Sequence, residues 1–173
     1  MAAMDIVAVA LLSAMPALVI AAGLSDLLTM RIPNLIPGAL IVAFFPAALA
    51  VGLPLDLAGL HGVVAIVALV VGMGLFALRI LGGGDAKLMA AVCLWLGPSA
   101  SFEFILWTAV FGGLLSLALI VARRDVAPHI VGGPVWVHTL LEAKGDIPYG
   151  IAIAVGALMA FPSSALLAAF AAG

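Results

Sequence analysis

Charged residues are scarce in this chain. Lys, Arg, Asp and Glu make up 8% of its 173 residues, whereas hydrophobic residues make up 67%. A soluble domain of this length needs far more polar surface, so lipid must surround most of the chain. Lipid accommodates only helices or closed β-barrels, and barrel strands alternate apolar and polar residues. The apolar runs here are long and continuous, which predicts an all-α membrane protein.

Cysteine and clustered basic residues are also nearly absent. The single cysteine, Cys93, excludes an intramolecular disulfide framework and a cysteine-rich zinc module. No basic cluster suggests nucleic acid as a partner, and we expect neither a metal ion nor another cofactor. The motifs G-x-S-x-G and H-E-x-x-H are missing as well. The sequence therefore argues against the serine hydrolases and zinc proteases that carry these motifs.

Six apolar segments predict a polytopic protein of about six transmembrane helices. Their approximate bounds are 5–25, 35–52, 57–81, 86–97, 101–122 and 149–171. A membrane-spanning helix needs roughly 20 residues. The fourth segment is shorter and reaches only about 18 Å. The glycine run before it, Gly82 to Gly84, is a candidate cavity wall, because irregular backbone at membrane depth must be buried in protein or line a wet cavity.

The Lys and Arg residues predict the orientation of these helices. All six fall in or beside the odd-numbered loops: Arg31, Arg79, Lys87, Arg123, Arg124 and Lys144. Cytoplasmic loops carry an excess of such residues, so we expect both termini outside. The stretch 123–148 then forms a cytoplasmic loop, with a short helix near 134–143 on the membrane surface. We expect a single membrane-embedded domain over 1–173.

Two aspartates lie where so apolar a chain least easily holds charge. Asp26 ends the first segment and Asp85 begins the fourth, so the predicted topology brings both to the cytoplasmic face. Two carboxylates within a few ångströms cannot both ionise easily, and one of them holds a proton near neutral pH. The ionised carboxylate can activate water as a general base, while the protonated one polarises a peptide carbonyl. The pair predicts an aspartic protease built from transmembrane helices.

Each polar residue of these two stretches also has a structural interpretation. Asp26 could pair with Arg31 at the interface, and Asp85 could cap the fourth helix after a tight glycine turn. Asn34 can cap the second helix, and Lys87 can extend along the apolar surface towards water. A non-catalytic membrane protein, such as a transporter or an assembly scaffold that uses the acids for ion binding, is therefore an alternative function.

Three motifs resemble those of type IV prepilin peptidases. D-x5-I-P-N from Asp26 to Asn34 and G-x-G-D-x-K-L from Gly82 to Leu88 are similar to the two aspartate motifs of that family, and IPYGIAIAVG at 147–156 resembles its last helix. The resemblance implies a GxGD-type membrane aspartic protease. Such enzymes remove the short basic leader from prepilins at the cytoplasmic edge of the bacterial inner membrane.

The resemblance also implies roles for individual residues and partners. It makes Asp26 and Asp85 the catalytic pair. The residues with implied supporting or substrate-binding roles are Gly82, Gly84, Lys87, Asn34 and Tyr149. The implied partners are a prepilin substrate and the lipid bilayer.

The compact length of the chain narrows the resemblance further. Larger bifunctional members carry an N-terminal cytoplasmic insert with paired cysteines and also methylate the new pilin N-terminus. Here the loop between the first two segments is too short for such an insert, and Cys93 lies within a helix, so N-methylation is not expected. The compact form looks like the peptidases of tight-adherence (Flp-type) pilus systems. Archaeal preflagellin peptidases share the same aspartates and are the alternative within the family.

Overall fold

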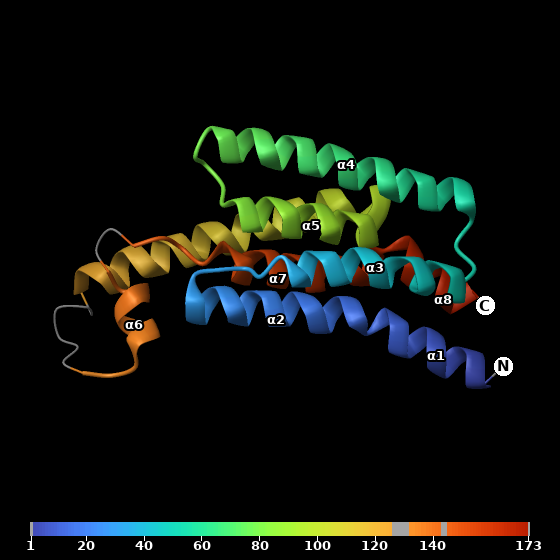
Figure 1. The fold of residues 1–173 in the computed structure, drawn as a ribbon, viewed down its shortest axis with the longest axis horizontal. Coiled ribbons are helices and arrows are strands. Elements are labelled where there is room, and N and C mark those ends of the chain that lie inside the picture. The colour runs from blue at the N-terminus through green and yellow to red at the C-terminus, as the bar shows by residue number, and fades with distance from the viewer. Residues whose placement is uncertain (1, 126–131, 143–144, 173) are drawn as a thin grey trace.

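The computed structural model describes residues 2–125, 132–142 and 145–172, and the regular elements within these ranges are all helices (Figure 1). In chain order they are α1 (Ala2–Leu12), α2 (Ala14–Thr29), α3 (Leu35–Ala50), α4 (Leu55–Ala77), α5 (Gly83–Asp125), α6 (Val135–Leu140), α7 (Tyr149–Ala160), the 3-10 turn η2 (Phe161–Ser163) and α8 (Ala165–Ala172). The prediction of an all-α polytopic membrane protein is confirmed.

The helices run back and forth along the long axis of the molecule (Figure 1). Four described helical stretches are long and apolar enough to cross a membrane: Met4–Thr29, Leu55–Ala77, Gly83–Asp125 and Tyr149–Ala172. α3 is a shorter apolar helix. The chain begins and ends at the same end of the bundle, as an even number of passes requires (Figure 1). α6 forms the short helix expected within 123–148, a loop of which residues 126–131 and 143–144 lie outside the described ranges.

Gly97 divides α5 into two arms, at the end of the predicted fourth segment. Its φ of 64° and ψ of −168° interrupt the helix, and Pro98 follows directly. Side chains disfavour a positive φ, so glycine suits the turn. The hydroxyl of Ser101 donates to the Gly97 carbonyl over 2.6 Å and closes the turn. The arm over 83–96 is shorter than the roughly 20 residues of a full crossing, which confirms the short fourth segment.

The two arms of α5 run in opposite directions. The first arm lies along α4, since a Cβ at Gly72 would contact Ala86 and the Leu94 carbonyl bonds to the His61 ring over 2.8 Å. The second arm lies along α7, since a Cβ at Gly112 would contact the ring of Tyr149. The start of the fourth pass therefore returns to the end of the molecule where α2 terminates (Figure 1).

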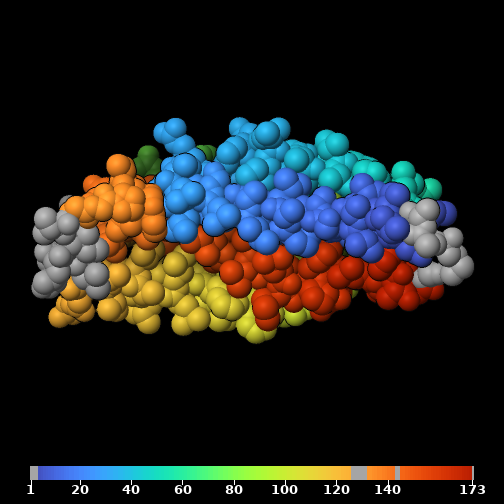
Figure 2. Space-filling view, turned by 90° about the horizontal axis from the view of Figure 1, so that it is seen from below, coloured from blue at the N-terminus to red at the C-terminus, as the bar shows by residue number. Residues whose placement is uncertain are grey.

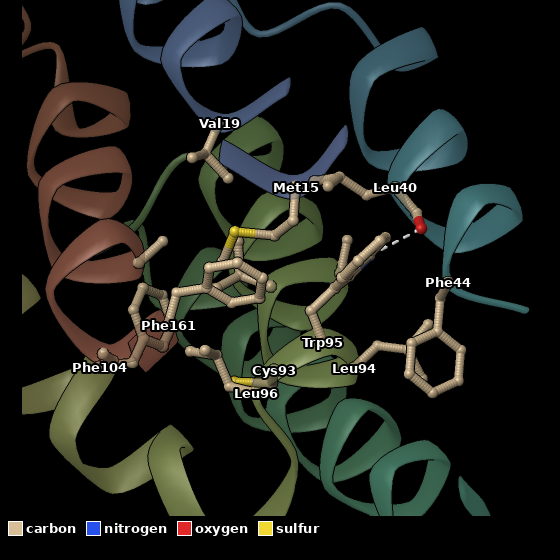
Figure 3. Packing of buried hydrophobic residues seen from close by; sticks show 14 of the residues in the cluster. Met15, Val19, Leu40, Phe44, Cys93, Leu94, Trp95, Leu96, Phe104 and Phe161 are labelled. Atoms are coloured by element: carbon tan, nitrogen blue, oxygen red, sulfur yellow. Dashed lines mark hydrogen bonds between the residues drawn. The ribbon is translucent and has the colours of Figure 1, made fainter. Parts of the chain in front are cut away.

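A core of apolar side chains joins the passes (Figure 3). Trp95 on the first arm of α5 is fully buried, and its indole N–H donates to the Leu40 carbonyl of α3 over 2.9 Å. Met15 of α2 and Phe104 of the second arm are buried in the same cluster. Cys93 is a buried free thiol within it, in keeping with its predicted place in a helix. Tight packing at these positions fixes the order of the helices.

Many large apolar side chains are exposed on the outer surface of the bundle. Val63, Ile66 and Val70 of α4 are exposed at helical spacing, so this helix presents an apolar face outward. Figure 2 shows another face, on which α1 and α2 lie along α7 and α8. Such surfaces suit contact with lipid. The α2–α7 contact also brings together two parts of the candidate site.

Candidate functional site

A cavity of about 550 Å³ opens where α2 ends and α5 begins. Asp26 and Asp85 both line it. The remaining lining residues are Met30, Phe76, Arg79, Ile80, Leu81, Gly82, Gly145, Asp146, Ile147 and Tyr149. The structure thus brings together the two aspartates for which the sequence predicted a pair. The volume of the cavity falls within the range of about 300–1,000 Å³ that is usual for ligand sites.

Asp26 lies in the last turn of α2 and is 7% exposed. The backbone N–H of Gly150, at the start of α7, donates to its Oδ2 atom over 2.7 Å. A Cβ at Gly150 would lie only 2.8 Å from Cβ of Asp26, so glycine permits this approach. Gly23, one turn earlier in α2, packs against Ala154 and the Gly150 carbonyl. Small residues on α2 and α7 therefore bring the donor to the carboxylate.

Asp85 lies in the first turn of α5 and is half-buried. A Cβ at Gly82 would lie 2.6 Å from its Oδ2 atom, and a Cβ at Gly84 would lie 3.3 Å from Ile32 in the α2–α3 connection. A second hollow of about 310 Å³ is lined by Gly82 to Gly84 together with both aspartates. The expectation that the glycine run forms a cavity wall is confirmed. Gly83 and Gly84 belong to the first helical turn of α5.

Lys87 and Asn34 do not line either hollow. The ammonium of Lys87 donates to Oδ1 of Asn34 over 3.0 Å and so ties the start of α5 to the start of α3. Asn34 precedes α3, but its side chain makes no capping hydrogen bond there, contrary to the capping interpretation. The two residues connect the first aspartate motif with the second from outside the cavity.

Tyr149 does line the cavity and has a fixed hydroxyl. Its oxygen lies 3.2 Å from the hydroxyl oxygen of Ser116 on the second arm of α5. The Tyr149 ring rests over Gly112, where a Cβ would lie 2.9 Å from it. The expected supporting residue is therefore part of the cavity wall and is held there by α5.

The chain was also compared with models of protein families. The model of the type IV leader peptidase family matches residues 13–117 of the chain. This protein belongs to the type IV leader peptidase family. The matched range contains both aspartate motifs and ends before Tyr149. The searches of curated proteins and of solved structures gave no match.

Basic residues of this leader peptidase family member gather at the cavity end. Arg79 lines the larger cavity and Arg31 the smaller one. Arg31 and Asp26 are both described and form no ion pair, so the suggested pairing is absent. Arg123 binds backbone carbonyls beside the cavity, and Lys144 lies outside the described residues. The described charges agree with the predicted grouping of odd-numbered loops at one end.

Sequence analysis of the leader peptidase site missed three residues. Gly150 supplies the hydrogen bond to Asp26, and Ser116 holds Tyr149. Arg79 lines the cavity. Gly150 stands in the IPYG motif that carried the family resemblance, so a signal for it was present. Ser116 lies in an apolar run with no motif around it, and only the three-dimensional arrangement reveals it.

Proposed function

We propose that this protein is an integral membrane aspartic endopeptidase that removes the leader peptide of type IV prepilins. One observation carries the proposal: two aspartates from separate motifs line a single cavity. Membership of the type IV leader peptidase family supports a substrate with a leader peptide. The surrounding apolar helices support reaction at a membrane boundary.

In the proposed reaction, the two carboxyl groups share the proton transfers of amide hydrolysis. The ionised member of the pair removes a proton from water as the water oxygen bonds to the carbonyl carbon of the scissile peptide. The protonated member donates its proton towards the carbonyl oxygen. Collapse of the tetrahedral intermediate breaks the C–N bond, and the leaving nitrogen takes up the proton that the pair had removed from water. As the C=O bond re-forms, the hydroxyl group that had received the other proton returns it to the pair. The aspartates end with one proton between them, as they began.

Cleavage is proposed to occur at the cytoplasmic face, with both termini on the other side. The gathering of the described basic residues at the cavity end supports this orientation. The short connection between α2 and α3 supports a dedicated peptidase of the Flp type without N-methylation activity. Gly82 and Gly84 are proposed to give the carboxylates room, and Lys87, Asn34 and Tyr149 to support the site.

The test is co-expression of the protein with a candidate Flp-type prepilin. Asp26→Asn and Asp85→Asn should each abolish removal of the leader, followed as a mobility shift and by mass spectrometry of the pilin N-terminus. Asp56→Asn is the matched control, because Asp56 is an exposed aspartate in the first turn of α4 and does not line the cavity. It should process the prepilin like the wild type.

Normal processing by either Asp26→Asn or Asp85→Asn would contradict the catalytic assignment. A wild-type protein that cleaves no prepilin but conducts ions in proteoliposomes would instead support the transporter alternative. Separation of these outcomes needs only the same purified protein, assayed with a prepilin in detergent and with an ion gradient in vesicles.

A further inference from the structure

One face of the second arm of α5 holds the chain that leads into α7. Gly112, Ser116 and Arg123 lie on this face at spacings of about one and two helical turns. Gly112 and Ser116 contact Tyr149, and Arg123 donates to the carbonyls of Gly145 and Asp146 over 2.8 and 2.7 Å. The held segment contributes Gly145, Asp146, Ile147 and Tyr149 to the cavity wall.

The number of hydrogens that each hydroxyl can donate fixes the direction of the Ser116–Tyr149 hydrogen bond. A serine hydroxyl has one hydrogen to donate, and Ser116 donates it to the Gly112 carbonyl over 2.7 Å. The 3.2 Å contact must then use the Tyr149 hydroxyl as donor and the Ser116 oxygen as acceptor. The hydrogen of Tyr149 is therefore already engaged away from the cavity. A role as proton donor to a substrate does not fit this arrangement, whereas a positioning role does.

Tyr149 is joined through one peptide bond to the donor that holds Asp26. The N–H of Gly150 belongs to the peptide that begins with the Tyr149 carbonyl, and it donates to Oδ2 of Asp26 over 2.7 Å. Because this peptide is planar, any displacement of the Tyr149 backbone that accompanies a shift of its ring tilts the N–H that orients the carboxylate. Gly112 gives the ring its place, because a side chain there would come within 2.9 Å of it.

We propose that Ser116 and Gly112 are positioning residues of the catalytic site, which act through Tyr149 and Gly150 on the orientation of Asp26. The inference rests on the proposed function, because it requires the carboxylate of Asp26 to be catalytic. The inference predicts that substitutions of Ser116 and Gly112 slow the turnover step. The cavity lining stays in place, so KM for the prepilin should change little, whereas a misplaced carboxylate lowers kcat by about 10- to 100-fold.

Adjacent glycines provide the first comparison. Gly112→Ala forces a Cβ against the Tyr149 ring, whereas Gly113→Ala meets nothing within 4 Å on the same helix. Gly112→Ala should lower kcat, and Gly113→Ala should behave like the wild type. Ser116→Ala and Tyr149→Phe each delete one partner of the same hydrogen bond and keep the side-chain shape. Each should lower kcat, and the double variant should cost no more than the larger single effect.

A second readout does not depend on cleavage. Tyr149 is the only tyrosine, so incorporation of 3-fluorotyrosine gives a single fluorine NMR resonance. Ser116→Ala, Gly112→Ala and Asp26→Asn should each shift this resonance, and Gly113→Ala should leave it unchanged. An unmoved resonance in Ser116→Ala, or a normal kcat with a shifted resonance, would overturn the inference. If the wild type cleaves no prepilin, the proposed function fails, and the response to Asp26→Asn alone decides whether Tyr149 and Asp26 are coupled.

Discussion

Gly150 donates its backbone N–H to Oδ2 of Asp26 over 2.7 Å, which joins residues 124 positions apart in the chain. The bond connects the first turn of α7 with the last turn of α2 and is buried. A carboxylate held by a rigid helix end can keep one orientation without moving at the moment of reaction. Preorganisation of this kind is a major source of catalytic power.

Substitution of Gly150 tests this relationship directly. In Gly150→Ala the new Cβ would lie 2.8 Å from Cβ and 2.9 Å from Oδ2 of Asp26. Gly150 does not have a positive φ, so the substitution tests the clash and not backbone strain. Prepilin cleavage should fall by about 100-fold, measured as initial rates in detergent. Gly62→Ala in α4, which meets nothing within 4 Å, should retain full activity.

We expect a side chain at Gly82 to displace the carboxylate of Asp85, as a side chain at Gly150 would displace that of Asp26. Alanine at this position would bring a Cβ within 2.6 Å of Oδ2, again at a residue without positive φ. Gly82→Ala should lower the cleavage rate by about 10- to 100-fold and leave the thermal unfolding midpoint nearly unchanged. Gly74→Ala has open space around it and serves as the control. Equal activities in the two variants would show that the carboxylate of Asp85 does not need this gap.

The hydrogen bond between Lys87 and Asn34 should couple the two aspartate motifs energetically. The contact spans 53 positions and involves a charged donor at 3.0 Å, but both side chains are exposed. A double-mutant cycle with Lys87→Met and Asn34→Ala should give a coupling of about 0.5–1 kcal/mol in the free energy of unfolding. The measurement is denaturant unfolding in detergent, and additive effects would contradict the coupling.

Arg123 and Arg124 are neighbours with opposite expected importance. Arg123 is half-buried and donates to three carbonyls, those of Leu140, Gly145 and Asp146. Arg123→Gln removes most of these donors beside the cavity and should lower cleavage by about 10-fold. In contrast, the side chain of Arg124 is 84% exposed and pairs only at the surface with Asp125.

The paired substitutions Arg123→Gln and Arg124→Gln therefore remove the same charge at adjacent positions. Exposed ion pairs contribute about 0–1 kcal/mol, so Arg124→Gln should keep both activity and stability. Initial cleavage rates and protease sensitivity of the loop before α7 provide the two measurements. Equal losses in the two variants would mean that net charge at this end matters and that the binding of the carbonyls does not.

Much of the fold was accessible from the sequence because lipid imposes a simple rule. Continuous apolar runs must be helices, and their lengths predicted the passes, including the short stretch that ends at Gly97. The grouping of Lys and Arg predicted that Asp26 and Asp85 share one end. The exact start of α5 was less accessible, because Gly83 and Gly84 have poor helix propensity and yet belong to the first turn of the helix.

The contacts within the site could not be predicted from the sequence. Periodicity shows which face of a helix is apolar, but it does not show which residue of a neighbouring helix faces a given aspartate. A serine in an apolar helix often donates its hydroxyl to the carbonyl four residues earlier, and Ser116 does so here. Its second contact, with Tyr149, depends on how two helices pack across 33 positions. The role of Asn34 as acceptor for Lys87 depends in the same way on tertiary structure.

The turn at Gly97 fixes the rotational setting of Asp85. Both ends of the arm over 83–96 are anchored, one by the buried ring of His61 against Gly97 and the other by Ile32 against Gly84. Each residue in a helix contributes about 100° of rotation and ~1.5 Å of rise. One residue added between the anchors would turn the carboxylate of Asp85 away from Asp26 instead of lengthening the arm. The number of residues between Asp85 and Gly97 therefore sets the orientation of the Asp85 carboxylate relative to Asp26. We expect this segment to tolerate substitutions but not insertions.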